Sequence, residues 1–375
     1  MKANWNRREM MLTAAGGTWL RRFEPDQETA VAKPEKGAEP AAGVLKIALV
    51  GAAHIHTPAF LKLIAARTDM AVTHVWDFDR GRAEAAAAQA GSARICADRR
   101  EIWSDPAIAA AVLLSETVRH RELVLEAAAA GKPVFVEKPL GTGREDAAAM
   151  AAAVARSGVL FQTGYFMRGE PVSLFLREQL KKGVFGKITR VRICVSNAGS
   201  LEGMFAREYG WMTDRKQAGF GGFGDIGMHG LDLLLWWFGK PARVTGRFQT
   251  LSGSPEDGNQ NGEAILEFKN GLLAVLAAGW LDRDNPMPIY IGGTTGCAYK
   301  QKDRFYFQSD AVEGADGRRA WNKFPAAWSH PLDLFLDAVA GRKEVPLVSA
   351  GEAAEGCAVM EAIGRAAEEH CWVDI

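Results

Sequence analysis

Two aspartates and a histidine in the second half of the chain are spaced as residues on one face of a helix would be. Asp225, His229 and Asp232 follow the glycine-rich stretch GFGGFG within a predicted helix at 219–238. At about 100° per residue they fall on one face of that helix. A histidine one turn from a carboxylate on a mostly apolar helix is a candidate general base that the carboxylate orients. A helix N-cap for Asp225 and a hydrogen-bonded core position for His229 are the alternatives.

A second candidate is the lysine of the tripeptide Glu137-Lys138-Pro139. The tripeptide follows a predicted strand at 133–136, and open parallel sheets bind ligands at the carboxyl ends of their strands. There the Lys138 ammonium group can hydrogen-bond a substrate hydroxyl and stabilise developing alkoxide charge. A surface lysine paired with Glu137 is the competing interpretation.

A strand, a tight turn and a helix beginning at Val44 indicate a dinucleotide site. Of the pattern G-x-G-x-x-G only Gly51 is present, and Ala53 and His56 stand at the positions of the other two glycines. Ala53 still permits fairly close backbone approach, whereas His56 does not provide the usual tight packing of helix on strand.

An acidic residue supports the same site. Asp77 ends the second predicted strand, 26 residues after Gly51. A carboxylate there bonds the ribose hydroxyls of NAD and repels the extra phosphate of NADP. We predict NAD, with NADP as the alternative because Arg80 or Arg82 would partly offset the repulsion. Asp79 competes with Asp77 for the role, and a solvated turn is the structural alternative.

The elements that must position these residues fall into two regions. From residue 44 to residue 165, short apolar runs alternate with alanine-rich helical stretches, which is typical of a doubly wound parallel sheet. From residue 166 to residue 375, turn-linked strands predict an open, mainly antiparallel sheet, with two helices at the end. The prediction is an α/β protein of two domains. The first-domain strands are predicted at 44–50, 71–76, 109–114, 133–136 and 159–163, and those of the second at 188–196, 243–251, 261–268, 272–278, 289–293 and 304–308.

Composition narrows the classes of partner. Lys plus Arg and Asp plus Glu each number 45, so no basic excess is available to neutralise a nucleic-acid backbone. The longest apolar runs are far below the roughly 20 residues that a membrane-spanning helix needs. The five cysteines are scattered and form no C-x-x-C pair, so we expect neither a disulfide framework nor a metal site.

Residues 1–43 differ from the rest. Asn6–Leu12 resembles a twin-arginine export motif, an apolar stretch follows, and Ala30–Ala32 offers an A-x-A cleavage site. A disordered tail is the alternative, because the apolar stretch is short and charged residues follow it. A working leader would place the protein in the periplasm, and otherwise it is cytoplasmic. Residues 33–43 are typical of a linker.

Taken together, these segments resemble the Gfo/Idh/MocA oxidoreductase family. The resemblance covers about residues 44–375 and rests on E-K-P after the fourth predicted strand and on D-x-x-x-H-x-x-D behind the glycine run. It also rests on Gly131–Val134 and on the ending Phe335–Val339 with Pro346–Val348.

The resemblance implies an N-terminal Rossmann domain and a C-terminal α/β domain whose open sheet lines the site and often mediates oligomerisation, so we expect a homo-oligomer (dimer or tetramer). By position, Lys138, Asp225 and His229 match the family's catalytic residues. The implied reaction moves a hydride from a substrate CH–OH carbon to nicotinamide. His229 would take the hydroxyl proton, Lys138 would hold the oxygen, and Asp225 would orient His229 or bond a neighbouring hydroxyl.

The chain also departs from the family pattern. Where the family often has T-P-N before a histidine, this chain has Ser115-Glu116-Thr117, with His120 following, and Glu116 adds a carboxylate beside the expected cofactor edge. The residues expected to contact the cofactor are Gly51, Ala53, His54, Ile55, Asp77, Ser115, Glu116, His120, Glu137 and Lys138. Those expected to contact the substrate are Lys138, Tyr165, Arg168, Trp211, Asp225 and His229, with core or surface packing as the alternative for Tyr165, Arg168 and Trp211.

Three functions fit these observations. The leading one is an NAD(P)-dependent dehydrogenase for a sugar, sugar acid or cyclitol, because several hydroxyls need polar partners. The second is a glycosidase that works by transient oxidation and elimination with NAD. The third is a ligand-sensing regulator of the same fold, which the joint presence of Lys138, Asp225 and His229 argues against.

Overall fold

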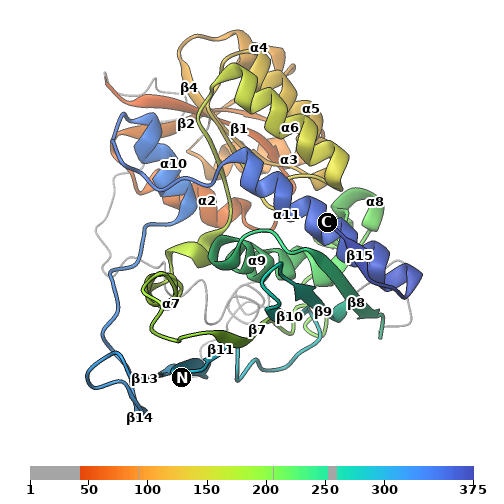
Figure 1. The fold of residues 1–375 in the computed structure, drawn as a ribbon. Helices are drawn as coiled ribbons and strands as arrows, with labels where there is room; N and C mark the ends of the chain where they lie inside the picture. Colours follow the sequence, from red (N-terminus) through yellow and green to blue (C-terminus); the bar gives the residue numbers. More distant parts are fainter. Residues whose placement is uncertain (1–42, 92, 206, 252–259) are drawn as a thin grey trace, which may run out of the picture.

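The computed structural model describes residues 43–375, apart from residues 92, 206 and 252–259 (Figure 1). The twin-arginine-like motif, its apolar stretch and the A-x-A site all lie outside the described residues, as does most of the predicted linker. No helix in the described part of the chain is both long and apolar enough to cross a bilayer.

Six parallel strands form the first sheet, in the order β3-β2-β1-β4-β5-β6. The chain runs outward from β1 to β3 and then returns to β4 beside β1, so the strand order reverses between β1 and β4. That reversal opens a crevice at the carboxyl ends of the strands, where α/β sheets bind ligands. The strands are β1 (Leu45–Ala52), β2 (Met70–Trp76), β3 (Arg94–Ile95), β4 (Ile108–Leu114), β5 (Val134–Val136) and β6 (Phe161–Thr163).

Helices connect these strands and cover the sheet (Figure 1). Because both faces are covered, β4 and β5 are buried almost throughout, which explains their continuous apolar runs. The five predicted strands are confirmed, and the two-residue β3 is an addition too short to leave a pattern. The helices are α2 (Thr57–Ala65), α3 (Arg80–Gln89), α4 (Arg100–Ser104), α5 (Thr117–Ala129) and α6 (Arg144–Ser157).

Nine strands form the second sheet, in the order β14-β13-β12-β11-β7-β10-β9-β8-β15. Its pairings are antiparallel except that β7 and β10 run parallel, so the prediction of a mainly antiparallel sheet is confirmed. The predictions missed β12, β14 and β15, of which β14 is an exposed edge strand without an apolar face. The strands are β7 (Ile188–Ser196), β8 (Arg243–Gln249), β9 (Asn261–Glu267), β10 (Leu273–Gly279), β11 (Ile289–Gly293), β12 (Gly296–Gln301), β13 (Arg304–Ser309), β14 (Asp316–Ala320) and β15 (Val373–Asp374).

Helix α9 packs on β7 and β10, and the last two helices return to the first sheet. Helix α10 contacts α2, whereas α11 packs against α6, β8 and α9, so it joins the two regions (Figure 1). The remaining elements are the 3₁₀ helices η2 (Phe166–Gly169) and η3 (Arg207–Met212) and the helices α7 (Pro171–Lys181), α8 (Arg215–Ala218), α9 (Gly221–Phe238), α10 (Pro331–Val339) and α11 (Ala350–Glu369).

Candidate active site

The turn after β1 brings the chain very close to the end of β4. Gly51 has a φ of +83°, and a Cβ on this residue would lie 2.6 Å from Ser115 Cβ and 2.7 Å from the Ser115 backbone nitrogen. Only glycine fits this conformation and this approach. The one glycine that remains of the expected pattern therefore stands where the backbone requires it.

The same turn leads into a helix whose N-terminus lacks a side-chain cap. His56 is the N-cap of α2 and makes no capping hydrogen bond with its side chain, and Pro58 lies in the first turn. N–H groups at such an end attract phosphate. Trp211 of η3 covers the turn, since its Nε1 donates to the Ala53 carbonyl oxygen at 3.1 Å, and Ile55 packs in the same cluster.

Asp77 lies beside this turn with its side chain buried. Its carboxylate accepts hydrogen bonds from the backbone nitrogens of Ala52 and Asp79, both at 2.6 Å, and from Arg82 Nε at 2.9 Å. Asp79 instead caps α3 by accepting from the backbone nitrogen of Arg82. The structure thus separates the two aspartates that compete in the sequence. Only Asp77 lies against the dinucleotide turn. Its carboxylate is fully buried and both oxygens already accept hydrogen bonds, so its contact with a ribose stays a prediction.

Arg82 joins Asp77 to the unusual Glu116. Its Nη1 lies 2.8 Å from Glu116 Oε1. Although burial disfavours the charge, the two carboxylates raise the pKa of Arg82 above its ordinary value. The extra carboxylate that the sequence placed near the cofactor edge is therefore neutralised within the protein. Arg80, the other candidate, pairs with Glu84 on the surface.

Ser115 follows the last residue of β4, and His120 lies in the first turn of α5; both side chains are buried. The Nδ1 of His120 lies 3.1 Å from the carbonyl oxygens of both Pro139 and Leu140, which requires the proton on Nδ1. Burial lowers the pKa of His120, so the ring is neutral. Its Nε2 has no hydrogen-bond partner among the described residues.

Glu137 is a buried carboxylate at the end of β5. Its Oε1 lies 2.8 Å from His56 Nδ1, and its Oε2 accepts the Lys138 backbone N–H at 2.8 Å. Although burial opposes ionisation, the neighbouring His54, His56 and Lys138 hold the pKa of Glu137 well below its usual value. Burial also lowers the pKa of His54 well below 6.5. A charged carboxylate and a neutral imidazole therefore face each other in the crevice.

Lys138 crosses from the first sheet to helix α9. Its Nζ donates to Asp225 Oδ1 at 2.9 Å and to the Asp225 carbonyl oxygen at 3.1 Å. The side chain is only 4% exposed, so the interpretation as a surface lysine paired with Glu137 does not hold. Asp225 lies inside α9, whose N-cap is Phe220, and it is therefore not a capping residue.

His229 lies one turn after Asp225, but the two do not pair. No hydrogen bond joins them in the described part of the chain, which corrects the expectation that Asp225 orients the ring. The physical reason is that the Lys138 ammonium, a full charge, takes the Asp225 carboxylate. His229 Nδ1 has no partner among the described residues, and burial together with Lys138 lowers the pKa of the ring well below 6.5.

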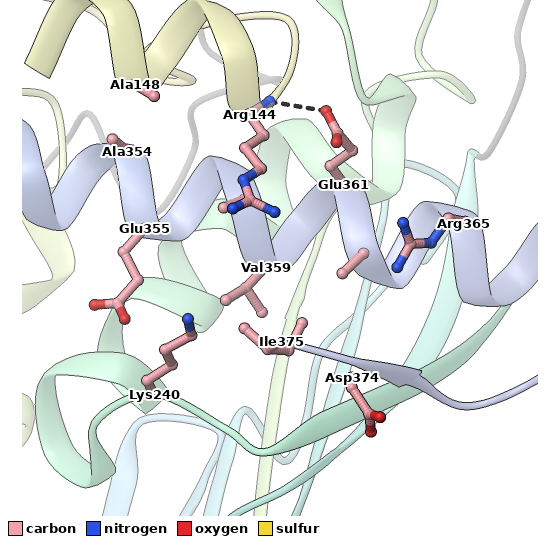
Figure 2. A pocket seen from close by; sticks show the side chains of 12 residues that line it. Arg144, Ala148, Lys240, Ala354, Glu355, Val359, Glu361, Arg365, Asp374 and Ile375 are labelled. Carbon is pink, nitrogen blue, oxygen red and sulfur yellow. Dashed lines mark hydrogen bonds between the residues drawn. The ribbon is translucent and has the colours of Figure 1, made fainter.

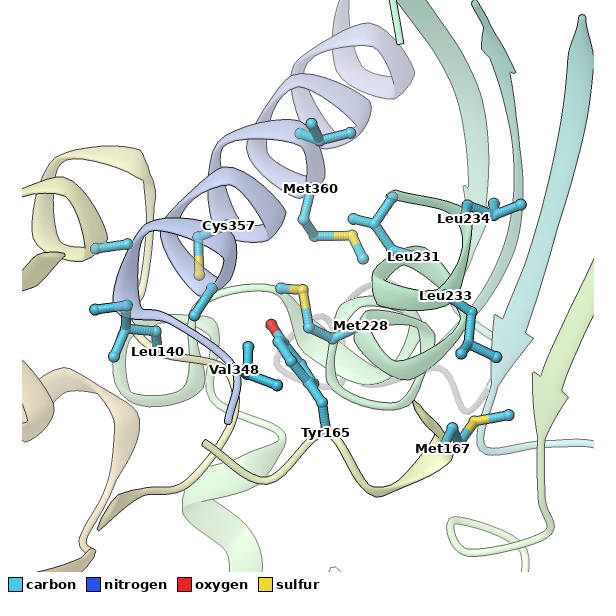
Figure 3. Packing of buried hydrophobic residues seen from close by; sticks show 14 of the residues in the cluster. Leu140, Tyr165, Met167, Met228, Leu231, Leu233, Leu234, Val348, Cys357 and Met360 are labelled. Atoms are coloured by element: carbon cyan, nitrogen blue, oxygen red, sulfur yellow. The ribbon is translucent and has the colours of Figure 1, made fainter. Parts of the chain in front are cut away.

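Two residues expected to contact substrate lie deeper in the protein. Tyr165 is 2% exposed and packs among Met228 and Cys357 (Figure 3). Arg168 forms two hydrogen bonds to Asp232, at 2.6 and 2.8 Å, and one to Glu352 at 2.7 Å. Although burial disfavours its charge, these carboxylates raise the pKa of Arg168. The geometry is that of an internal clamp between η2, α9 and α11.

The structure also shows a pairing that the sequence did not suggest. The sequence predicts His54 as a cofactor contact and places His56 at the position of the third glycine, whereas in the structure His56 bonds directly to Glu137. The available signal was the spacing H-x-H after a strand that ends in glycine.

A separate surface pocket lies between α6 and α11 and is lined by Arg144, Lys240, Glu355 and others (Figure 2). It shares no residue with the site, and its charges are of both signs.

Known proteins match both regions of the chain. Residues 45–165 match the family description "Oxidoreductase family, NAD-binding Rossmann fold", and residues 174–299 match "GFO/IDH/MocA C-terminal domain". An inositol 2-dehydrogenase 2 of Saccharopolyspora erythraea is 31% identical over 62% of this chain and 64% of its own length. A scyllo-inositol 2-dehydrogenase (NAD(+)) of Bacillus subtilis is 28% identical over 43% of this chain and 44% of its own.

The fold has close counterparts among solved structures. A levoglucosan dehydrogenase in complex with NADH and levoglucosan superposes with a TM-score of 0.72, at 22% identity, over 88% of this chain and 99% of that one. An oxidoreductase from Agrobacterium radiobacter in complex with NAD+, L-tartaric acid and magnesium also gives 0.72, at 20% identity, over 88% and 98%. At these identities the similarity establishes the fold.

Proposed function

The chain belongs to the Gfo/Idh/MocA oxidoreductase family, with an NAD-binding Rossmann domain, and from that premise we propose that it is a dehydrogenase acting on a CH–OH carbon of a sugar, sugar acid or cyclitol. One observation carries the proposal. Lys138, at the carboxyl end of β5, bonds Asp225 of α9, and neutral His229 lies one turn further along that helix. A proton acceptor and a hydrogen-bond donor thus belong to one buried cluster at the ligand-binding edge of the sheet.

The residues at that edge suit NAD. The tight turn at Gly51, the uncapped start of α2 and the buried carboxylate of Asp77 would hold its pyrophosphate and ribose. Ser115, Glu116 and His120 lie at the end of β4 and the start of α5, next along the same edge. When bound, NAD supplies the hydride acceptor.

The chain's own residues would handle the proton and the oxygen. Among the described residues His229 Nδ1 has no hydrogen-bond partner, and its ring is neutral, so it can accept the substrate hydroxyl proton. Lys138 uses two of its three N–H donors on Asp225, which leaves one for the substrate oxygen. Asp225 would act by holding Lys138 in place. Arg168 and Tyr165 would support the site from the interior rather than contact the substrate.

The polar side chains of the site and the names of the relatives support the proposed substrate class. Inositol 2-dehydrogenases and a levoglucosan dehydrogenase carry names that specify polyhydroxylated rings. Several polar side chains around Lys138 would satisfy such a ring's hydroxyls.

We also propose residues 44–165 and 166–375 as the two domains, with α10 and α11 returning to the first.

We further propose that the protein forms a homo-oligomer through the second sheet. Ile265 and Leu273 are 37% and 47% exposed on neighbouring strands β9 and β10, and Ile265 pairs with Val275 across the ladder. Exposed apolar side chains on one face of a sheet are candidates for subunit contacts. Light scattering should give a mass above that of a monomer, and Ile265→Lys together with Leu273→Lys should reduce it.

The proposed reaction is tested by incubating the protein with NAD and a panel of free sugars, sugar acids, cyclitols and nitrophenyl glycosides. NADH absorbance and nitrophenol release are followed in the same wells. Accumulating NADH that is lost in Lys138→Ala supports the dehydrogenase and identifies its substrate class. Nitrophenol release without net NADH would replace it with a redox glycosidase. NADH formation that persists unchanged in Lys138→Ala would contradict the assigned site.

A further inference from the structure

Two histidines and a glutamate converge where β1 and β5 end. His54 and His56 lie in the turn after β1, Glu137 follows β5, and one potential ligand atom from each lies within 4.8 Å of the other two. His54 and Glu137 are buried, whereas the His56 side chain is 36% exposed. The cluster is therefore anchored in the protein on one side and reachable from solvent on the other.

The donor set is one that transition metals favour. Two imidazole nitrogens and a carboxylate oxygen bind zinc in catalytic sites, where a fourth position stays open for water or a substrate oxygen. Within the described residues, no ammonium or guanidinium group bonds the Glu137 carboxylate. Its two oxygens meet the His56 ring and the backbone N–H of Lys138. A buried carboxylate without a bonded cation gains most from a divalent ion.

The protein positions all three side chains. A Cβ on Gly164 would lie 2.5 Å from Glu137 Oε2, so the glycine leaves the space that the carboxylate occupies. The His56 backbone N–H donates to His54 Nδ1 at 3.2 Å, which puts the proton of the neutral His54 ring on Nε2, so an ion at His54 must displace either this hydrogen bond or that proton. The His56 ring also stacks on Phe60, with centroids 5.8 Å apart. The space at Gly164 and the stacking on Phe60 support Glu137 and His56 from behind, and support of this kind orients metal ligands.

We propose that His54, His56 and Glu137 bind one divalent transition-metal ion, and that its open position takes an oxygen of the substrate. The inference rests on the proposed function, because Glu137 is the residue next to Lys138, which is assigned to the reacting hydroxyl. A substrate with two adjacent oxygens, a vicinal diol or an α-hydroxy acid, is then held by Lys138 at one oxygen and by the ion at the other.

Zinc titration of the untagged, full-length protein tests the site. The protein is stripped with a chelator and titrated with zinc against a chromophoric chelator, without NAD or substrate. His56→Gln and Glu137→Gln each remove one ligand. His370→Asn is the matched control, because His370 is an exposed histidine with a φ of +59° at the end of α11, a conformation that asparagine tolerates. We expect one zinc per chain in the wild type and the control, and binding at least about 100-fold weaker in the two variants.

Two results would overturn the metal site: wild-type binding no tighter than that of His56→Gln, or an equal loss in His370→Asn. Because His56 is partly exposed, His56→Gln should keep its melting temperature. In the wild type, zinc should increase the affinity for a vicinal diol more than the affinity for its single-hydroxyl analogue. In His56→Gln this difference should be absent. Absent zinc binding with NADH formation intact would refute the metal alone, whereas zinc binding without turnover of any polyol would refute the proposed function.

Discussion

Helix α9 carries two aspartate–cation pairs that look alike in composition and differ in how completely they are satisfied. Asp232 receives a two-point contact from Arg168, whose third hydrogen bond goes to Glu352, and both side chains are less than 8% exposed. Asp225 receives only the Lys138 ammonium, and its side chain is 15% exposed. The first pair lies toward the middle of the helix, and the second lies at the crevice of the first sheet.

The difference teaches where chemistry is available. In the Arg168 pair, every side chain is committed, which suits a buried charge that must be fully compensated. Beside the Lys138 pair, one N–H of Lys138 and Nδ1 of His229 have no hydrogen-bond partner in the part of the chain that the structure describes. Leaving buried polar groups unpaired is costly unless a ligand uses them. We therefore assign the reaction to the incompletely satisfied pair and stability to the other.

The largest expected effect tests the Lys138–Asp225 pair and the neighbouring His229. Lys138→Ala or His229→Asn should each lower kcat/KM by about 1000-fold, since each removes a group that acts on the moving proton or the oxygen. NADH binding, measured by fluorescence, should persist, because the turn at Gly51, the start of α2 and Asp77 are proposed to hold the pyrophosphate and ribose even without these side chains. Unchanged turnover in either variant would show that the two pairs do not differ in the way proposed.

The next effect tests the clamp. Arg168→Met leaves Asp232 buried without a cation and should lower the free energy of unfolding by about 3–5 kcal/mol, measured by urea denaturation. The double variant Arg168→Met/Asp232→Leu removes both charges and should recover much of that loss. Turnover per folded molecule should change far less than in Lys138→Ala. A double variant as unstable as the single one would mean that the pair is not a clamp.

A smaller effect concerns the cofactor end of the same crevice. Asp77→Ala should weaken NAD binding by about tenfold and NADP binding by less, because the carboxylate bonds ribose hydroxyls and repels the extra phosphate. Asp79→Ala is the control, since that residue caps α3 and should cost about 1 kcal/mol of stability without changing cofactor preference. Equal losses for NAD and NADP in Asp77→Ala would remove the ribose assignment.

The last effect is a pH dependence of stability to which the buried histidines near the Lys138 pair contribute. Burial lowers the pKa of His54, His120 and His229 below 6.5, so the unfolded chain takes up their protons first as the pH falls. Their contribution to stability is complete above about pH 6.5 and is lost below it, with a slope of at most about 1.4 kcal/mol per pH unit for each ring.

Urea unfolding followed from neutral to mildly acidic pH measures this slope, which should be shallower in His229→Asn. The lowered pKa also keeps His229 deprotonated, so kcat/KM should hold down to a pH below the ordinary histidine range. Activity that falls with an apparent pKa of 6.5 or above would argue against a buried neutral base.

Much of the fold could be predicted because the patterns are local. Strands β4 and β5 are continuous apolar runs and β1 is nearly so, and at Gly51 the turn passes so close to Ser115 that a side chain would meet it. The placement of Lys138 at a strand end and of Asp225, His229 and Asp232 on one helix followed from element order and helical periodicity. The strands β12, β14 and β15 were missed because short strands in a half-exposed sheet owe their pairing to neighbours rather than to their own pattern.

By itself, then, the sequence determined the α/β class, the two sheets, and which residue types reach the carboxyl ends of the strands. Only the tertiary structure decided the partners. Helical periodicity places Asp225 and His229 on one face, yet Lys138, 87 residues away in sequence, binds the Asp225 carboxylate. His229 Nδ1 is left without a hydrogen-bond partner among the described residues. Arg168 meets Asp232 across 64 residues in the same way. The spacing of residues within a helix or strand determines on which face their side chains lie. The strongest charge pairs, in contrast, form between distant segments that packing brings together.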